Sequence, residues 1–183
     1  KQAYVIKSGR TVLDDGGGVC QASTTLFRAA LLAGLPIIGR QAHAYRVGYY
    51  EQGGFDPGLD ATVYSPTVDL KIKNDTQNSL LIQTLTDQQD LSLTIQLYGT
   101  SDGRVATIGK TKIWDQIKPP EDLYQDDPTL PKGQVKQVDF PAWGAKTSFT
   151  YKVNKGQEIL EDQTFYSTYQ AWQAVFLRGT KEN

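Results

Sequence analysis

The chain has 183 residues, of which 39% are hydrophobic, with 19 basic and 20 acidic side chains. This is enough apolar material for one sizeable core or two small ones. The near balance of charge gives no reason to expect nucleic-acid binding, and no basic run points to an anionic membrane surface. No apolar stretch is long enough to span a bilayer, and a single cysteine excludes an internal disulfide and a zinc site built on cysteines.

The N-terminal part predicts a short strand at residues 3–7 and then a glycine turn that leads into a helix. Three consecutive glycines, residues 16–18, precede Cys20. The apolar residues that follow recur at spacings of three and four, which is typical of an amphipathic helix. Gly34 and Pro36 supply its end. We therefore expect a helix that begins beside Cys20.

Cys20 is the first candidate for a catalytic role. The free amides at the start of a helix, and the positive end of its dipole, stabilise a thiolate and lower the pKa of the thiol. The same amides could hold an oxyanion after attack on a carbonyl. The alternative is that Cys20 is a small buried apolar residue.

His43 is the only histidine and therefore the only imidazole base available to Cys20. Residues 43–50 are rich in Tyr and Val, which predicts a strand that presents His43. Asp60, which precedes the next apolar run, could orient the ring. The order Cys, His, Asp along the chain is the one that papain-like and transglutaminase-like enzymes use. This comparison is an analogy and not evidence of homology. The alternatives are a structural histidine and an aspartate that forms a turn.

Other residues near these three are candidates for oxyanion or substrate binding. Ser23 and Thr24 could bind the substrate peptide or cap the helix. Arg46 could meet a substrate carboxylate or could simply be solvated. No phosphate loop and no cluster with metal-ligand spacing is present, so we expect neither a cofactor nor a metal. The full set of oxyanion and substrate-binding candidates is Gly18, Gln21, Ser23, Thr24, Tyr45 and Arg46.

The rest of the chain is read as strands and loops. A glycine-rich loop is expected at 51–59 and an alternating strand at 68–73. Residues 80–86 and 91–98 alternate and predict an antiparallel hairpin with one buried face that covers the helix. A boundary at 99–103 precedes a strand at 105–114 and a proline-rich, extended and solvated connector at 118–133. Strands are then expected at 135–140, 148–153, 159–166 and 174–177, with a hairpin turn at 154–156.

These elements predict an α+β fold, with one main N-terminal helix packed on an antiparallel sheet and a small β-rich module after it. The expected division is an α+β domain at 1–100, a strand and connector at 101–133, and a β-rich tail at 134–183.

Three blocks, in this order, resemble the VanW domain: GGGVCQASTTLFRAALLAGLPI, HAYRV and GLDATVYSPTVDLKIKND. The resemblance covers roughly residues 3–97, with Ala22 where valine is common. It implies a protein of the bacterial cell envelope, associated with glycopeptide-resistance gene clusters. Some family members are understood to be L,D-transpeptidases that cross-link peptidoglycan stem peptides with the domain's cysteine. By position, the resemblance implies Cys20 as nucleophile, His43 as base and Asp60 as the third residue.

The tail resembles, more loosely, the end of a G-five domain, through the segments PAWGAKTSFTYKV and TFYSTYQAWQAVFLRGT. Together the resemblances lead us to expect an L,D-transpeptidase that forms a thioester with a stem tetrapeptide. The alternatives are a cysteine-dependent peptidoglycan endopeptidase, amidase or carboxypeptidase, and a non-catalytic cell-wall-binding module in which Cys20 is structural.

The expected partners are peptidoglycan stem peptides and not nucleic acid. The sequence starts at Lys1 and contains no methionine. We therefore expect a monomeric domain of a longer, extracytoplasmic envelope protein, whose anchor or signal lies outside this sequence.

Overall fold

The structure is a computed structural model that describes residues 2–7, 10–15 and 17–182. The described residues form one α-helix, α1 (Val19–Leu32), and a 3-10 segment, η1 (Gly48–Gly54), which is broken by non-helical backbone at Gln52 and Gly53. In chain order the strands are β1 (Gln2–Lys7), β2 (Arg10–Asp15), β3 (Ile37–Gly39), β4 (Lys71–Ile72), β5 (Leu81–Asp87), β6 (Ser92–Tyr98), β7 (Arg104–Ile108), β8 (Lys112–Ile117), β9 (Leu123–Pro131), β10 (Val135–Asp139), β11 (Gly144–Lys155), β12 (Glu158–Tyr169) and β13 (Val175–Lys181).

The chain is mostly β, and the expected α+β class is wrong. Strands hold 49% of the described residues, whereas α1 has only 14 residues. Two features account for the difference. The proline-rich segment expected as a connector contains β9, which pairs in parallel with β13. Strands β11 and β12 run for 12 residues each, which is longer than their apolar alternation indicated.

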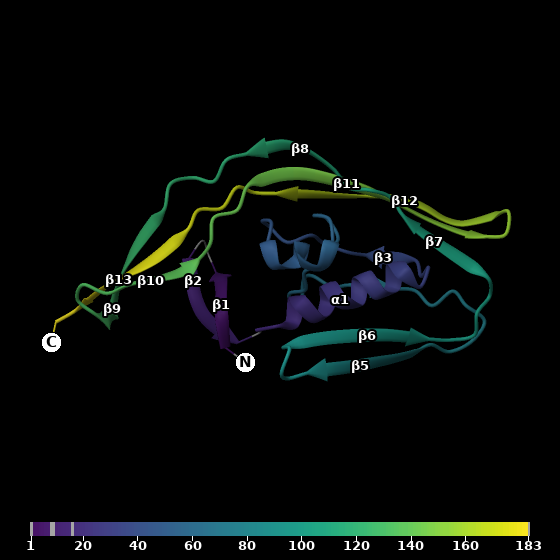
Figure 1. The fold of residues 1–183 in the computed structure, drawn as a ribbon, viewed down its shortest axis with the longest axis horizontal. Helices are drawn as coiled ribbons and strands as arrows, with labels where there is room; N and C mark the ends of the chain where they lie inside the picture. The colour runs from purple at the N-terminus through teal and green to yellow at the C-terminus, as the bar shows by residue number, and fades with distance from the viewer. Residues whose placement is uncertain (1, 8–9, 16, 183) are drawn as a thin grey trace.

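Helix α1 lies between two β layers, as Figure 1 shows. One layer is the sheet β12-β11-β7, with β8 paired to another part of β11. The other is the antiparallel hairpin β5–β6, whose prediction is confirmed, with β6 beside α1. In β6 the side chains alternate between half-buried and exposed, while those of β5 are all exposed. The face of the hairpin toward the helix is therefore only half-buried.

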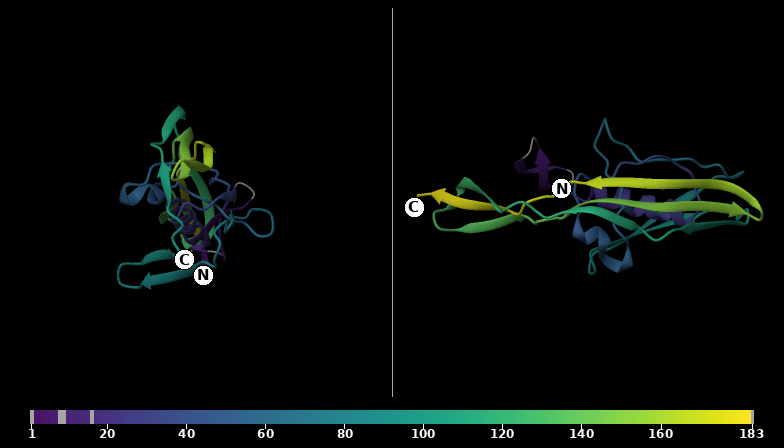
Figure 2. Two further views of the ribbon diagram at one scale, coloured as in Figure 1. Left: turned by 90° about the vertical axis from the view of Figure 1, so that its right-hand side faces the viewer. Right: turned by 90° about the horizontal axis from the view of Figure 1, so that it is seen from above.

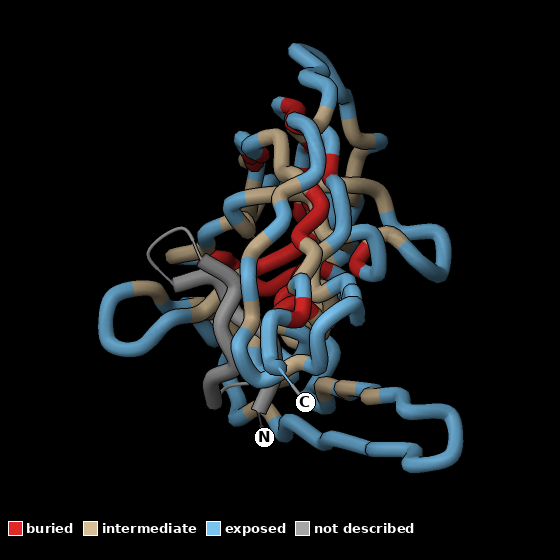
Figure 3. The backbone as a smooth tube through the Cα atoms, turned by 90° about the vertical axis from the view of Figure 1, so that its left-hand side faces the viewer, coloured by how far each residue is buried: buried red, intermediate tan, exposed pale blue. Residues whose placement is uncertain are grey.

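The core joins α1 to the inner face of β11 and β12. Phe27 and Leu31 of the helix are fully buried. Because side chains of a strand alternate between faces, every second residue of β11 points to this core. Phe165 of β12 stacks on Phe149 at 5.0 Å and meets Phe27 edge-on at 5.8 Å. Figure 3 shows the buried residues gathered in this central region. The C-terminal strands thus pack on the N-terminal helix, and the three-part domain division stays a prediction.

The remaining strands form smaller sheets along an elongated molecule. The three-stranded sheet β10-β13-β9 carries the C-terminus at one end of the long axis (Figures 1 and 2). Two-stranded sheets join β1 to β2 and β3 to β4. The strand expected at 68–73 is real but short, because only β4 pairs with β3 there. No helix in the described ranges is long and apolar enough to cross a membrane.

The strand expected at residues 43–50 is wrong. Residues 43–47 lie in no strand, and η1 begins at Gly48. The main-chain N–H of His43 donates to the Asp60 side chain at 2.8 Å instead of joining a β ladder. Side-chain acceptors of this kind compete with strand pairing for the backbone donor.

The end of α1 at Gly34 is confirmed by its hydrogen bonds. Gly34 adopts φ +73°, a left-handed conformation that glycine takes without steric cost. Its N–H donates to the Leu31 carbonyl at 3.1 Å, and the Leu35 N–H reaches back to the Ala30 carbonyl at 3.0 Å. This pair of bonds is the Schellman motif, which satisfies the last carbonyls of a helix.

Replacing Gly34 with Ala should lower the free energy of unfolding by about 2 kcal/mol or more. An added Cβ would be strained by the positive φ and would lie 2.9 Å from Arg104 Cδ and 3.2 Å from Val153 Cγ1. Gly103→Ala is the matched control, since Gly103 also has a positive φ of +82° but nothing within 4 Å of an added Cβ. Denaturant unfolding followed by tryptophan fluorescence measures both. Equal losses in the two variants would contradict the contribution of packing at Gly34.

Candidate functional site

Cys20 is the second residue of α1, at the start that the glycine turn predicts. Gly18 is the N-cap, with φ +90° and no side chain to cap the helix, and the first turn carries no acidic residue. The thiol is half-buried; it lies 3.4 Å from Thr62 Oγ1 and donates to the Val63 carbonyl at 3.6 Å. The positive end of the helix is therefore available to a thiolate at this position.

His43 and Asp60 are hydrogen-bonded to each other. The ring Nδ1 lies 2.6 Å from Asp60 Oδ2, the same oxygen that accepts from the His43 main-chain N–H. An ionised carboxylate only accepts, so Nδ1 carries a proton and Nε2 is left for another partner. The Tyr50 ring packs against the imidazole with centroids 4.7 Å apart. The ring is thus held on one edge and one face.

Asp60 is 4% exposed and is surrounded by donors. Its other oxygen, Oδ1, accepts from Arg40 Nη2 at 3.1 Å and from the hydroxyl of Tyr169. Arg40 itself donates to the Asp60 and Gly58 carbonyls, both at 2.6 Å, and to Ser167 Oγ at 2.9 Å. A buried carboxylate stays ionised only when it is paired in this way.

The three side chains shift one another's proton affinity. The neighbouring His43 ring is the main reason that the pKa of Cys20 falls from 9.0 to about 7, although burial of the thiol opposes this. Burial alone would lower the pKa of His43, but the hydrogen bond to Asp60 and the neighbouring Cys20 sulfur outweigh it and raise that pKa from 6.5 to about 9. Burial would likewise raise the pKa of Asp60, but His43 and Arg40 lower it. Between about pH 7 and 9 the favoured state is thiolate, imidazolium and carboxylate.

The thiol and the imidazole are adjacent without a formed hydrogen bond. The His43 ring has the largest effect on the Cys20 pKa, yet Nε2 is buried and has no hydrogen-bond partner among the described residues. Catalytic hydrogen bonds are often long in the free enzyme and tighten when substrate binds. The arrangement can therefore pass a proton between the two groups after a small movement.

Helix α1 is fixed to the segment that carries Asp60. The Thr24 hydroxyl donates to the Ala61 carbonyl at 3.2 Å and accepts from the Ala61 N–H at 3.1 Å. One turn further along, Arg28 Nε donates to the Leu59 carbonyl at 2.7 Å. These bonds set the position of Cys20 relative to the residues that follow Asp60.

The other candidate residues lie in different surroundings. Gly18 and Gln21 are exposed at the start of α1, beside Cys20. Ser23 is buried and its hydroxyl has no partner among the described residues. Tyr45 stacks on Trp172 with centroids 5.1 Å apart. Arg46 forms two hydrogen bonds to Glu51, at 2.9 and 2.7 Å, so its guanidinium is already paired.

Sequence reasoning missed several residues that contact the three central side chains. Thr62 follows Asp60 closely and could have been found from that position alone. Tyr169 lies on the inner face of β12, two residues after Ser167 and four after Phe165. A predicted strand that continued past residue 166 would have placed it on this face. Arg40 had no signal in the sequence, because its partners come from two separate segments, at residues 58–60 and at Ser167.

A small cavity of about 10 Å³ lies behind Asp60, lined by Arg28, Tyr50, Glu51, Tyr169 and neighbouring residues. That volume suits one water molecule and not a substrate. Neither Cys20 nor His43 lines this cavity, so it is not a binding cleft at the thiol. Across the described ranges, no group of three or more His, Cys, Asp or Glu side chains is arranged to hold a metal ion.

Solved structures similar to this chain include two G5 domains, the module that the tail resembles in sequence. "IgA1 Protease G5 domain structure" is 19% identical with a TM-score of 0.26, and covers 43% of this chain and 90% of that one. "Crystal structure of HP0197-G5" is 13% identical with a TM-score of 0.21, and covers 42% of this chain and 97% of that one.

Two curated proteins are similar to about half of the chain. "Uncharacterized protein YoaR" of Bacillus subtilis (strain 168) is 39% identical over 83 residues, which are 45% of this chain and 26% of that protein. "Vancomycin B-type resistance protein VanW" of Enterococcus faecalis (strain ATCC 700802 / V583) is 31% identical over 91 residues, 50% of this chain and 33% of that protein. The chain spans about a quarter to a third of their length.

Among protein families, the one described as "VanW like protein" matches residues 1–98. These residues are more than half of the chain, and they include Cys20, His43 and Asp60. The chain therefore belongs to the VanW family.

Proposed function

We propose that this chain is a cysteine acyltransferase that acts on peptidoglycan stem peptides, as an L,D-transpeptidase. The observation that carries the proposal is the Asp60–His43 hydrogen bond beside a Cys20 thiol whose pKa is lowered to about 7. A nucleophile, a base next to it and a group that orients the base are the elements of nucleophilic acyl transfer.

In the first half-reaction the Cys20 thiolate attacks the carbonyl of the L-centre that precedes the terminal D-residue. The C–S bond forms, and the oxyanion faces the free amides at the start of α1. The C–N bond then breaks, and the imidazolium of His43 gives its proton to the leaving amine. D-alanine departs and a thioester remains on Cys20.

In the second half-reaction the side-chain amine of another stem peptide attacks the thioester. His43 takes a proton from this amine, the new amide bond forms and the thiolate is regenerated. If water attacks instead, the same residues hydrolyse the thioester and the enzyme is a carboxypeptidase. The cell-wall substrate and the extracytoplasmic location are supported by family membership and by the similarity to the vancomycin B-type resistance protein of Enterococcus faecalis.

Incubation of purified muropeptides with the chain, followed by mass spectrometry, tests this function. The native chain should give a cross-linked species that has lost D-alanine, and Cys20→Ala should give none. Lys146→Ala is the matched control, because Lys146 pairs with Asp115 on the surface and should leave the product unchanged. A species that is only shortened by D-alanine would indicate the carboxypeptidase.

A cleaved internal peptide bond or a released glycan would indicate the endopeptidase or the amidase. If native chain and Cys20→Ala both leave the muropeptides unchanged and bind the cell wall equally, the transferase is excluded. The chain would then be a non-catalytic wall-binding module.

A further inference from the structure

We infer that Tyr169 of β12 is a positioning residue of this site. Its hydroxyl donates a hydrogen bond to the Asp60 carboxylate and thereby limits the basicity of His43. Tyr169 lies outside residues 1–98, the part that the family comparison matches. The inference rests on the proposed function for its role in catalysis, but the titration that tests it needs no substrate.

The two oxygens of Asp60 face different parts of the fold. Oδ2 accepts both bonds from His43, at 2.6 and 2.8 Å. Oδ1 accepts from Arg40 and from the Tyr169 hydroxyl. Burial and the charge of Asp60 raise the pKa of Tyr169, so its hydroxyl keeps its proton and remains the donor. Strand β12 therefore holds the carboxylate from the side opposite His43.

A donor to Asp60 changes the proton affinity of His43 in a defined direction. Asp60 is ionised whether or not His43 is protonated. When the imidazolium loses its proton, the carboxylate loses its nearest positive charge and depends more on its other donors. Tyr169 therefore stabilises the state with neutral His43 more than the state with imidazolium. Without the hydroxyl, His43 should hold its proton more strongly.

The other charged and titratable groups around this pair come from every element packed on it. Cys20 and Arg28 come from α1, Tyr50 from η1, and Arg40 from the segment after β3. Removal of either arginine deletes a charge, and removal of Cys20 deletes the nucleophile. Tyr169 is the partner of Asp60 whose hydroxyl can be removed with the side chain's shape retained.

This limit on basicity matters for a residue that both gives and takes a proton. His43 must release its proton to the leaving amine and accept one from the acceptor amine. A general acid and base works best when its pKa is near the working pH. Tyr169 keeps His43 closer to that range.

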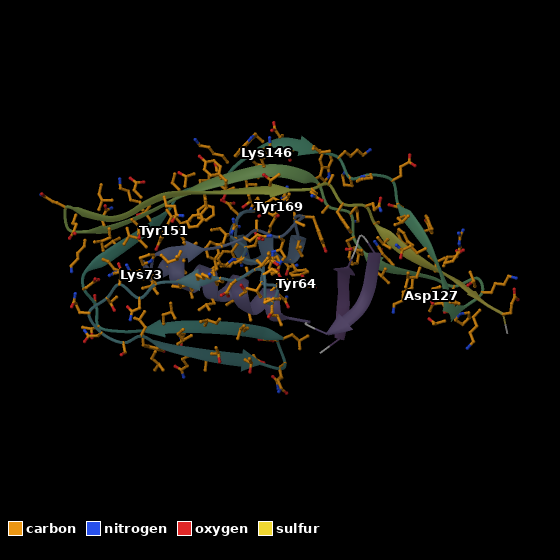
Figure 4. All side chains as sticks on the ribbon, turned by 180° about the vertical axis from the view of Figure 1, so that it is seen from behind. Tyr64, Lys73, Asp127, Lys146, Tyr151 and Tyr169 are labelled. Carbon is orange, nitrogen blue, oxygen red and sulfur yellow. The ribbon has the colours of Figure 1, made fainter. Side chains whose placement is uncertain are left out.

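The test is an NMR pH titration of the whole chain, in which His43 supplies the only imidazole signal. Tyr169→Phe should raise the midpoint of the His43 titration by about 0.5 to 1 pH unit relative to the native chain. Tyr151→Phe is the matched control. Tyr151 is equally buried in the neighbouring strand, but its hydroxyl donates to the Leu35 carbonyl at 3.1 Å, away from Asp60. Figure 4 shows the two tyrosines at separate points along the sheet.

A second variant covers the case in which Tyr169→Phe is poorly folded. Fluorinated tyrosine at position 169 keeps the ring and makes the hydroxyl a stronger donor, so it should lower the midpoint. A midpoint that stays or falls in Tyr169→Phe, or that shifts equally in Tyr151→Phe, overturns the inference. If the His43 midpoint rises as expected but the native chain leaves the muropeptides unchanged, the inference about Tyr169 stands and the proposed function is excluded. If the midpoint does not change but the native chain gives a cross-linked product, the proposed function stands and the inference is overturned.

Discussion

Replacing Asp60 with Ala should lower the free energy of unfolding by about 3–5 kcal/mol, which is among the largest losses expected for one substitution. The carboxylate is buried and accepts from His43, Arg40 and Tyr169. Its removal takes away the carboxylate acceptor of His43 and Tyr169 and leaves the Arg40 charge without its counter-ion. Breaking a buried pair is costly because the remaining group stays desolvated.

Asp60→Asn separates charge from shape in the same measurement. The amide oxygen of Asn can still accept from Arg40 and Tyr169, so its loss of stability should be smaller than that of Ala. Asp115→Ala is the surface control, since Asp115 pairs with an exposed Lys146 and should change stability by no more than about 0.5 kcal/mol. A loss of that small size for Asp60→Ala would contradict the buried network.

The shifted pKa values of Asp60 and His43 predict how the free energy of unfolding depends on pH. The pKa of Asp60 is lowered in the folded chain. Its contribution to the free energy of unfolding is therefore complete above pH 3.8 and is lost as the pH falls through the folded pKa. The pKa of His43 is raised from 6.5 to about 9, so its contribution is complete below 6.5 and is lost as the pH rises through about 9. In Asp60→Asn both slopes should be reduced.

Local patterns predicted the parts of the fold that local rules govern. The apolar spacing gave α1, Gly34 marked its end, and strict alternation from Leu91 to Leu97 gave the β5–β6 hairpin. Residue type and sequence context also predict Cys20, His43 and Asp60 as the candidate site. The structure places Asp60 and His43 in hydrogen-bond contact and His43 beside Cys20. Their catalytic roles stay a proposal.

What the sequence could not predict depends on contacts between distant segments. The Arg40 guanidinium joins carbonyls of Gly58 and Asp60 to Ser167, which is 127 positions away. The segment at His43 has the composition of a strand, but a side-chain acceptor takes its backbone donor. Hydrophobic periodicity along the sequence does not predict a hydrogen bond of this kind. The mostly β class was missed for a similar reason, because β9 is a strand only through its pairing with β13.

Replacing His43 with Gln should return the pKa of Cys20 from about 7 toward 9.0, since the imidazole is the largest cause of the lowered value. The thiolate fraction at pH 7 should fall from about one half to about one in a hundred. Alkylation by iodoacetamide at pH 7 should slow by only about tenfold, because a thiolate of higher pKa is the stronger nucleophile. Acyl transfer should fall by about 10²- to 10⁴-fold, since the general acid and base is lost.

Ultraviolet absorbance of the thiolate against pH gives the Cys20 titration directly. Gln41→Ala is the control, because the Gln41 side chain is exposed and only its main chain pairs with Thr62, so its removal should leave the Cys20 pKa unchanged. The midpoint in His43→Gln also separates the two sources of the low Cys20 pKa. A value near 9.0 assigns the effect to the imidazole. A value that remains near 7 would contradict this and assign it to the amides of α1, Thr62 and Val63, since these are unchanged in the variant. An intermediate midpoint measures the share that the α1 amides, Thr62 and Val63 supply together.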